Sequence, residues 1–471
     1  MSKKLYVALF LIMFFAIIIS GCSTDSETPI MRENNTINDT IRDAYTFTFP
    51  LVIMDATLKY STNTEKPQGG KAPINQLIHS RRLANADDRT VVTPNIDTLY
   101  TQAYFDLSKD AMVFYKPKTD RFCSVEMIDA YTNCRHILGT GGDTEDERSY
   151  LVTGPDFTGE VPEGLKLISM PTNMGWMLVR TIINDKSDYE NVYTIQDSMK
   201  LVPLSAYLEN GFNYTPPSGI YDIRYEYEPL RHVQNMSPQD YFNTANKLML
   251  ANPPAAEDAK IVARMKKIGV GPGLTFNQSI LGPNGLQKWK DMLAGLTNWL
   301  TSESKEFLKQ MGIWVLYGEP IAEFGDEYEY RALIAIAALG ANPISVAIYP
   351  KATTDDNGAV LNGTNSYRIH FEKDALPPVK TNGFWSITAY GEDNFPIDNE
   401  IDRYLINDRS KVKYNDDGSL DIILQQQPPQ GGEMFENWLP VKDNFHLHLR
   451  IYLPKEEVLN DTWKTPSIIR D

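Results

Sequence analysis

The stretch 445-FHLHLRIY-452 alternates apolar and polar side chains as far as Arg450. Successive side chains of a β-strand point to opposite faces of a sheet, so a period of two predicts a strand. The apolar side chains would share one face, and the opposite face would carry His446, His448 and Arg450. We therefore expect a half-buried strand with one core face and one polar face.

Further short runs with the same period follow Pro343. Turn signals such as Asp356-Asn357-Gly358 and Asp416-Asp417-Gly418 separate them. Short strands with such turns and no helices between them predict a β-sandwich of jelly-roll type over residues 341–471. The other strands are expected at Ser345–Tyr349, Ser366–Phe371, Gly383–Tyr390 and Leu420–Gln425.

The middle of the chain, residues 226–340, has helical periodicity. Ser237 and Pro238 offer an N-cap and a first-turn proline to one helix. The apolar spacing of Gln287–Met311 predicts a long amphipathic helix, and Tyr330–Leu339 is expected to form a final apolar one. This helical region would connect two β-rich parts of the chain.

Residues 43–225 are expected to form a first, mainly β domain. Asp43–Tyr60 has nearly helical spacing and contains Pro50, which we expect to kink or divide the segment. Strands are predicted at Thr98–Leu107, Met112–Tyr115, Phe122–Ile128, Lys166–Met170 and Trp176–Ile183. The predicted fold class is α+β, with a β-rich N-terminal domain, a helical middle segment and a C-terminal sandwich.

The first residues have the order of an export signal. Lys3 and Lys4 precede the apolar run Leu5–Ile19, whose about 15 residues fall short of the roughly 20 that a membrane span needs. The sequence 19-ISGC-22 resembles a lipobox, in which the cysteine thiol carries a diacylglyceryl group. We expect a signal peptide over residues 1–21 and lipidation at Cys22. The alternative is an ordinary secretory signal with an incidental cysteine.

Behind the anchor, residues 22–42 are expected to form a polar tether. Two or three acyl chains would hold the protein stably, because each buried methylene contributes about 0.8 kcal/mol. The expected location is therefore the cell envelope, with the membrane as partner through Cys22. Ser23 replaces the aspartate that resembles an inner-membrane retention signal, which favours the outer membrane, facing the periplasm or the surface.

The composition limits the other partners. A formal net charge of -16, without clusters of Lys and Arg, argues against binding to nucleic acid. The glycine-rich stretch 269–273 lacks the Lys-Ser/Thr of a phosphate loop, and we expect no cofactor. An oxidising compartment permits a disulfide between Cys123 and Cys134, but two separate thiols fit the spacing equally well. No sequence feature indicates the oligomeric state.

Two ordered sets of motifs resemble known domain families. The first set is Thr93-Pro94-Asn95-Ile96-Asp97-Thr98-Leu99-Tyr100, Gly154-Pro155, Pro171-Thr172-Asn173 and Arg180-Thr181. The second is Tyr367-Arg368-Ile369-His370-Phe371, Pro377-Pro378-Val379, Phe384-Trp385-Ser386-Ile387-Thr388-Ala389-Tyr390, Arg403-Tyr404, Asp417-Gly418-Ser419-Leu420, Asn437-Trp438-Leu439-Pro440 and Leu449-Arg450-Ile451-Tyr452. They resemble, respectively, the domain of unknown function 1254 and its usual partner 1214. The resemblance implies two modules with β-rich ends around helices, the second a jelly-roll sandwich, and it implies no reaction.

The first set of motifs contains candidate catalytic residues. Asn95 and Asp97 lie in a loop that leads into a strand, near Tyr100, and a carboxylate there could act as general base if its surroundings raised its pKa. The favoured alternative is local, because Asn and Asp side chains commonly cap turns. Arg180 could clamp an anionic substrate or pair with Asp97.

Metal binding is a weaker interpretation of two other patterns. His446 and His448 could chelate zinc with His370 or a carboxylate as third ligand, but a polar sheet face is favoured. The run 398-DNEID-402 spaces carboxylates as calcium loops do, without their glycine and terminal glutamate. We therefore expect no metal.

Aromatic residues of the C-terminal half could line a groove in which rings stack on a sugar or an apolar ligand. The favoured alternative places them in the sandwich core. The candidate ligand-binding residues are Asn95, Tyr100, Trp385, Arg403, Tyr404 and Trp438.

Two functional hypotheses follow. The first is an envelope enzyme acting on a small-molecule, lipid or glycan substrate where the two β modules meet, with Asp97 as base, Arg180 as clamp and His370 or Tyr390 as proton partner. The second is a non-catalytic envelope protein that captures a glycan or lipid. No serine-hydrolase elbow or zinc-protease helix occurs in the sequence, so those two enzyme classes are disfavoured.

Overall fold

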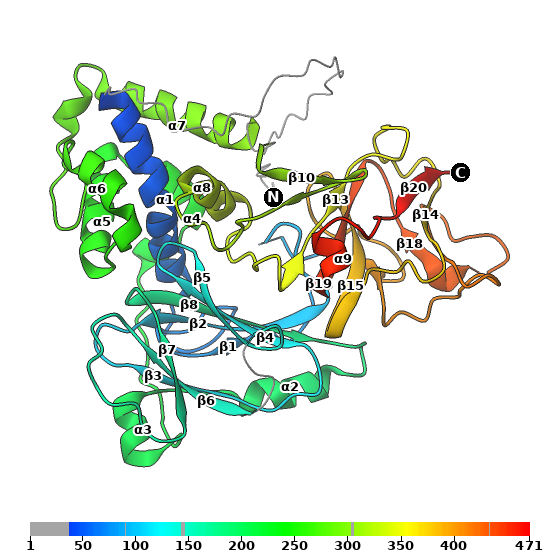
Figure 1. Cartoon of the computed structure of the whole chain (residues 1–471), viewed down its shortest axis with the longest axis horizontal. Helices are drawn as coiled ribbons and strands as arrows, with labels where there is room; N and C mark the ends of the chain where they lie inside the picture. Colours follow the sequence, from blue (N-terminus) through cyan, green and yellow to red (C-terminus); the bar gives the residue numbers. More distant parts are fainter. Residues whose placement is uncertain (1–36, 90, 143–146, 303–305, 433) are drawn as a thin grey trace, which may run out of the picture. The chain divides into compact units, whose positions relative to one another are not determined.

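The fold is known from a computed structural model that describes residues 37–471 except 90, 143–146, 303–305 and 433 (Figure 1). Ile37–Asp471 form one unit by their internal contacts. The predicted signal peptide, Cys22 and the predicted tether as far as residue 36 lie outside the described residues. None of the helices that the structure describes has the length and apolar character needed to cross a bilayer.

Two β-sheets between residues 78 and 203 share one apolar core. The five-stranded sheet has the order β1 (Ile78–His79), β2 (Thr98–Asp106), β8 (Met174–Ile182), β4 (Cys123–Asp129) and β5 (Cys134–Gly139). The four-stranded sheet has the order β7 (Leu165–Ser169), β6 (Arg148–Thr153), β3 (Met112–Lys116) and β9 (Lys200–Pro203). Val125 and Val179 of the first sheet join Phe114 and Val152 of the second in one buried cluster. The predicted β-rich N-terminal region is confirmed.

Four strands and two α-helices of this region escaped prediction. Strands β1, β5, β6 and β9 are short and do not alternate clearly. Helices α2 (Tyr189–Ser198) and α3 (Leu204–Asn210) follow β8 and β9 in the chain.

One N-terminal helix and several helices of the middle region pack into a second core. The long helix α1 (Ile37–Ser61) lies against α4 (Pro229–Gln234), α5 (Pro238–Ala251), α6 (Ala259–Lys266) and α8 (Tyr328–Ala337) (Figure 1). Phe47 of α1 and Tyr241 of α5 belong to the same buried cluster. Packing on several sides outweighs the local cost of Pro50, so α1 continues through the proline and is not divided. The predicted N-cap is confirmed, because the Ser237 hydroxyl accepts the Asp240 N–H.

The predicted helix Gln287–Met311 is too long. Helix α7 (Gly285–Ser302) ends earlier, and Leu308–Met311 form strand β10, paired with β11 (Trp314–Tyr317). Gly312 lies between the two strands with φ of 62°, a left-handed conformation that glycine adopts without strain. The apolar residues at the end of the run therefore belong to a β-hairpin and not to the helix.

The C-terminal part contains two sheets around a third core. The larger sheet has the order β10, β11, β13 (Lys351–Ala352), β19 (Phe445–Pro454), β15 (Val379–Gly391) and β16 (Leu405–Asn407), and β12 (Ala347–Ile348) also pairs with β19. The smaller sheet has the order β18 (Trp438–Pro440), β17 (Leu420–Gln425), β14 (Tyr367–Phe371) and β20 (Ser467–Arg470). Ile387 and Leu449 of one sheet and Ile369 and Ile422 of the other share one buried cluster. The predicted α+β class is confirmed, while jelly-roll connectivity stays a prediction.

Strand β19 is central to the larger sheet, between β13 and β15 (Figure 1). Its apolar residues Phe445, Leu447 and Leu449 lie in the sandwich core, as the alternation predicted. The opposite face of β19 carries His446, His448 and Arg450, so the larger sheet presents polar groups away from that core.

The two described cysteines are free thiols. Cys123 begins β4 and Cys134 begins β5, and both are buried. Of the two interpretations that the spacing left open, the structure has separate thiols.

Candidate functional site

The polar face of β19 continues across its neighbouring strands. Register places Tyr390 of β15 opposite His446, and Lys351 of β13 opposite His448. Residues opposite each other in adjacent strands have side chains on the same face. The face of the sheet that points away from the sandwich core therefore gathers a lysine, two histidines, a tyrosine and an arginine.

The loop that precedes β2 in the N-terminal module lies on this face. The Tyr390 hydroxyl donates to the carbonyl of Pro94 at 2.6 Å and accepts from Arg450 Nη2 at 2.7 Å. Arg450 Nη2 also donates to the carbonyl of Thr93 at 3.0 Å, and Nη1 donates to Thr388 Oγ1 at 3.0 Å. The bonds to the carbonyls of Pro94 and Thr93 cross from one module to the other, so the polar face is the junction of the two modules.

Thr93 has a strained backbone at this junction. Its φ is 45°, although a β-branched residue is rarely found in the left-handed region. The hydrogen bonds from its N–H to the Asn394 carbonyl, at 2.7 Å, and from Arg450 to its own carbonyl hold it there. Strain of this kind costs about 1–3 kcal/mol and is concentrated at functional sites.

Asp97, the predicted general base, is buried in the junction with both carboxylate oxygens occupied. One oxygen accepts from Ser386 Oγ at 2.5 Å, and the other accepts from Arg409 at 2.8 Å and Asn407 at 3.3 Å. Its side chain has no exposed surface. A carboxylate held in this way is poorly placed to accept a proton from a substrate.

Asn95 makes the local turn contacts expected of this loop. Its Oδ1 accepts the N–H groups of Asp97 at 2.7 Å and Thr98 at 3.1 Å, while its Nδ2 donates to the Tyr452 hydroxyl at 2.5 Å. Asn95 therefore shapes the loop and ties it to β19.

Arg180 does not pair with Asp97, and that part of the prediction is wrong. Its Nη1 donates to Glu126 of β4 at 2.6 Å and to Asn342 at 3.0 Å, and its Nη2 donates to the Gly340 carbonyl at 2.6 Å. The Tyr100 ring centroid lies 5.7 Å from this guanidinium. Burial raises the pKa of Glu126 to about 7 despite the neighbouring cation. The guanidinium thus joins β4 and β8 to the segment after α8.

The structure does not bring His370 to these residues. His370 lies on β14 of the smaller sheet, where its Nδ1 is 2.7 Å from Asp421. The β14 neighbours Ile369 and Phe371 point into the sandwich core, so His370 is on the outer side of the other sheet. The predicted partnership of His370 with Asp97, or with the β19 histidines around zinc, is wrong for this reason. Over the described part of the chain, no three metal-ligating side chains converge.

The predicted aromatic groove residues lie inside the protein. Trp385 is 3% exposed in the sandwich core, and Trp438 donates from Nε1 to the Gln425 carbonyl at 2.8 Å. Arg403 Nη1 donates to the Trp438 carbonyl at 2.9 Å, and the Tyr404 hydroxyl donates to Asp402 at 2.9 Å. These side chains support the sandwich and its loops and do not line an open groove.

Two imidazole nitrogens at the junction have no hydrogen-bond partner among the described residues. Nε2 of His446 and Nε2 of His448 are both shielded from solvent and unpaired, although His448 as a whole is half-buried. Burial, reinforced by Lys351 and Arg450, lowers the pKa of His446 to about 3 and that of His448 well below its usual value. Burial also lowers the pKa of Lys351. Both imidazoles are therefore neutral at neutral pH.

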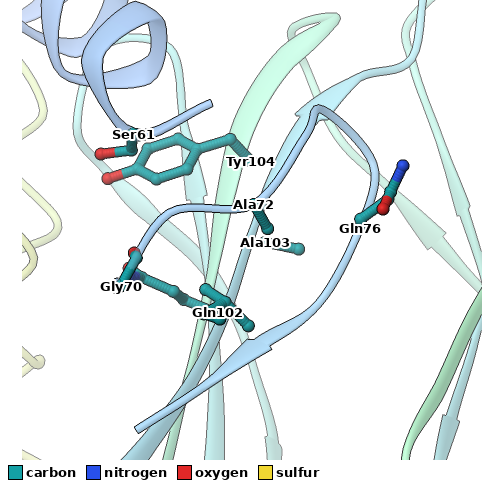
Figure 2. A pocket seen from close by; sticks show the side chains of 8 residues that line it. Ser61, Gly70, Ala72, Gln76, Gln102, Ala103 and Tyr104 are labelled. Carbon is teal, nitrogen blue, oxygen red and sulfur yellow. The ribbon is translucent and has the colours of Figure 1, made fainter. Parts of the chain in front are cut away.

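Two surface hollows lie elsewhere. Figure 2 shows a hollow beside the end of α1, where the Tyr104 ring points toward Ser61, and it encloses no space for a ligand. A second, open hollow of about 380 Å³ is lined by Asn63, Thr64, Glu65, Gln68, Gly69, Lys71, Tyr221 and Glu226.

Sequence reasoning missed several junction residues. Ser386 and Thr388 alternate with the core residues of a predicted strand. The period of two therefore already indicated that they lie on the face opposite the core. Glu126, a charged residue inside the apolar run 122–128, was a further signal. Arg409 and Lys351 carried no local signal, because their positions depend on strand pairing.

Comparison with known proteins agrees with this architecture. Residues 74–203 match the family described as protein of unknown function (DUF1254), and residues 346–456 match protein of unknown function (DUF1214), which confirms the resemblance seen in the motifs. No relative was found among curated proteins.

Two crystal structures are similar to the chain. The VPA0106 protein from Vibrio parahaemolyticus has a TM-score of 0.70 at 19% identity, over 93% of this chain and 100% of that one. An uncharacterised protein from Burkholderia cenocepacia has a TM-score of 0.42 at 11% identity, over 92% and 94% of the two chains. The first similarity supports the fold alone.

Proposed function

We propose that this chain, which carries a DUF1254 domain followed by a DUF1214 domain, is a lipid-anchored envelope protein that binds a small molecule at the junction of the two modules without transforming it. The observation that carries the proposal is the pair of unpaired Nε2 atoms of His446 and His448 on the polar face of β19.

Unpaired buried polar atoms destabilise a folded protein. A buried donor or acceptor without a partner costs about 1–3 kcal/mol, and such groups are rare in native structures. A ligand that hydrogen-bonds to both imidazoles would remove this cost. The strained Thr93 on the same face supports a functional role, because such strain persists where function requires it.

Binding fits the junction better than catalysis. The candidate base Asp97 is occupied by three donors, and the candidate clamp Arg180 is engaged by Glu126 and the segment after α8. The Tyr390 hydroxyl already donates its proton to the Pro94 carbonyl. These groups hold the modules together, which leaves the histidine end of the face for a ligand.

The envelope location rests on the sequence. The lipobox-like 19-ISGC-22 follows an apolar run, and we propose a lipid on Cys22 with the outer membrane favoured over the inner. A tethered binding protein would keep a small solute near the membrane.

A thermal-shift screen of the purified mature protein tests the proposal. Wild type and H446F are compared across small carboxylates, phosphates and saccharides, with H136F as control at a half-buried histidine of β5. We expect at least one compound to raise the Tm of wild type and H136F but not of H446F, and to be recovered unchanged. A compound recovered in altered form would favour the enzyme hypothesis. Equal stabilisation of all three proteins, or of none, would contradict a binding site at the junction.

A further inference from the structure

We infer that the junction site takes an oxyanion, the carboxylate or phosphate group of its ligand, between Lys351, His446 and His448. This inference rests on the proposed function and adds the chemical class of the ligand. Three observations carry it: the charge of the face, its free donors and their spacing.

The first observation is an uncompensated positive charge. Within residues 37–471 as described, neither Lys351 nor Arg450 has a carboxylate within ion-pair distance. Asp97 is the carboxylate whose charge acts on Arg450, and it is already paired with Arg409 at 2.8 Å. Burial lowers the pKa of both histidines and of Lys351, and no described carboxylate raises any of these pKa values. A buried cationic face of this kind is stabilised by an anion.

The second observation is the supply of hydrogen-bond donors. A lysine ammonium has three N–H donors, and a neutral imidazole can donate from Nε2. Arg450 is held in place by Thr388, Tyr390 and the Thr93 carbonyl, so it supplies charge and fixed geometry. Hydrogen bonds from such groups to a carboxylate or phosphate are roughly twice as strong as bonds between neutral groups.

The third observation is spacing. The rings of His446 and His448 have centroids 5.4 Å apart, and Lys351 lies directly across from His448 in the next strand. Opposite residues in adjacent strands have Cβ atoms about 4.5–5.5 Å apart. One oxyanion with two or more oxygens could therefore accept from both imidazoles and from the ammonium group.

The same charges disfavour a metal ion. Two imidazoles could ligate zinc, but a cation would face Lys351 and Arg450 across a poorly solvated space. A structural zinc site also needs about four ligands.

Calorimetric titration of the mature protein with sodium phosphate, sodium acetate and sodium sulfate tests the inference, with sodium chloride holding ionic strength constant. The variants are K351Q and, as matched control, K442Q at an exposed lysine of the same module. We expect phosphate or acetate to bind wild type and K442Q, and K351Q to weaken that binding about tenfold or more. Acetate binding alone would identify a carboxylate ligand, and phosphate with sulfate would identify a tetrahedral one.

The pH dependence gives a second readout. An anion next to His446 favours the protonated imidazole and so raises its pKa from its lowered value. Protons then bind together with the anion, so affinity for an anion of unchanged ionisation, such as sulfate, should rise as pH falls from 7 to 5. The groups that face His446 and take part in this linkage are Lys351, His448, Tyr390 and Arg450.

Several outcomes would overturn the inference. Binding of these anions that is equal in wild type and K351Q would place them elsewhere. Zinc binding lost in H446F would assign the histidines to a metal. If no oxyanion binds wild type while a neutral compound from the thermal-shift screen depends on His446, the inference fails and the proposed function stands. If nothing depends on His446, both fail.

Discussion

Replacing His446 with phenylalanine is expected to make the protein less sensitive to acid. His446 is 5% exposed and stacks on the Tyr390 ring at a centroid distance of 5.7 Å, which a phenyl ring can retain. Its pKa is lowered from 6.5 to about 3, by burial first and then by Lys351 and Arg450. The folded protein therefore keeps the imidazole neutral at pH values where the unfolded chain protonates it.

The sign and size of the effect follow from this difference. A histidine with a lowered pKa in the folded state contributes stability above pH 6.5, and this contribution is lost as pH falls from 6.5 toward 3. Each pH unit in that window costs about 1.4 kcal/mol, so the wild type loses about 2 kcal/mol through His446 between pH 7 and 5. H446F has no imidazole at this position, so it does not lose this stability.

Urea unfolding at pH 7 and pH 5, followed by circular dichroism, measures the effect. The difference in unfolding free energy between wild type and H446F is expected to shift by about 2 kcal/mol in favour of the variant at pH 5. Subtracting the unfolding free energy of one protein from that of the other removes the contributions of groups that titrate equally in both. H136F controls for the loss of one histidine. A difference that stays constant within about 0.5 kcal/mol would refute the buried, neutral state of His446.

Three other predictions concern the junction, the thiols and the anchor. D97A should lower the unfolding free energy by at least about 2 kcal/mol, because it leaves the buried donors of Ser386 and Asn407 without their acceptor and removes one of the two carboxylates that pair with Arg409. D393A, at an exposed ion pair, should cost at most about 1 kcal/mol, and equal losses in urea titrations would contradict the assigned burial. Cys123 and Cys134 should react with a thiol reagent only after unfolding, and a mass that rises by two protons on reduction would show a bridge instead. C22A should lack the mass of the acyl chains and partition into buffer without detergent. Unchanged membrane association of C22A would contradict the predicted lipid anchor.

Local patterns were sufficient for much of the secondary structure. The alternation in 445-FHLHLRIY-452 identified a strand and its two faces, because the period of two follows directly from strand geometry. The N-cap at Ser237 could also be predicted from the sequence, since a capping hydroxyl accepts a backbone N–H only a few residues further along the chain. Met311 was misassigned because a short apolar hairpin and a helix end have similar spacing.

The candidate site was predicted only in part. The loop with Asn95 and Asp97 and the strand residue Tyr390 do meet at the junction, where the first functional hypothesis placed Asp97 and Tyr390. Arg180 and His370 were given partners that they do not have, because a salt bridge or a shared site depends on which strands become neighbours.

By itself the sequence determined most of the strands and helices, the apolar side of the strands that alternate, and the lipobox-like start of the chain. Only the tertiary structure decided that Lys351, His446 and His448 share a buried face, that Asp97 is occupied by Arg409, and that the aromatic rings lie inside. The physical reason is that periodicity and capping act over a few residues. Burial and charge pairing are set by elements that lie far apart in the chain and meet only on folding.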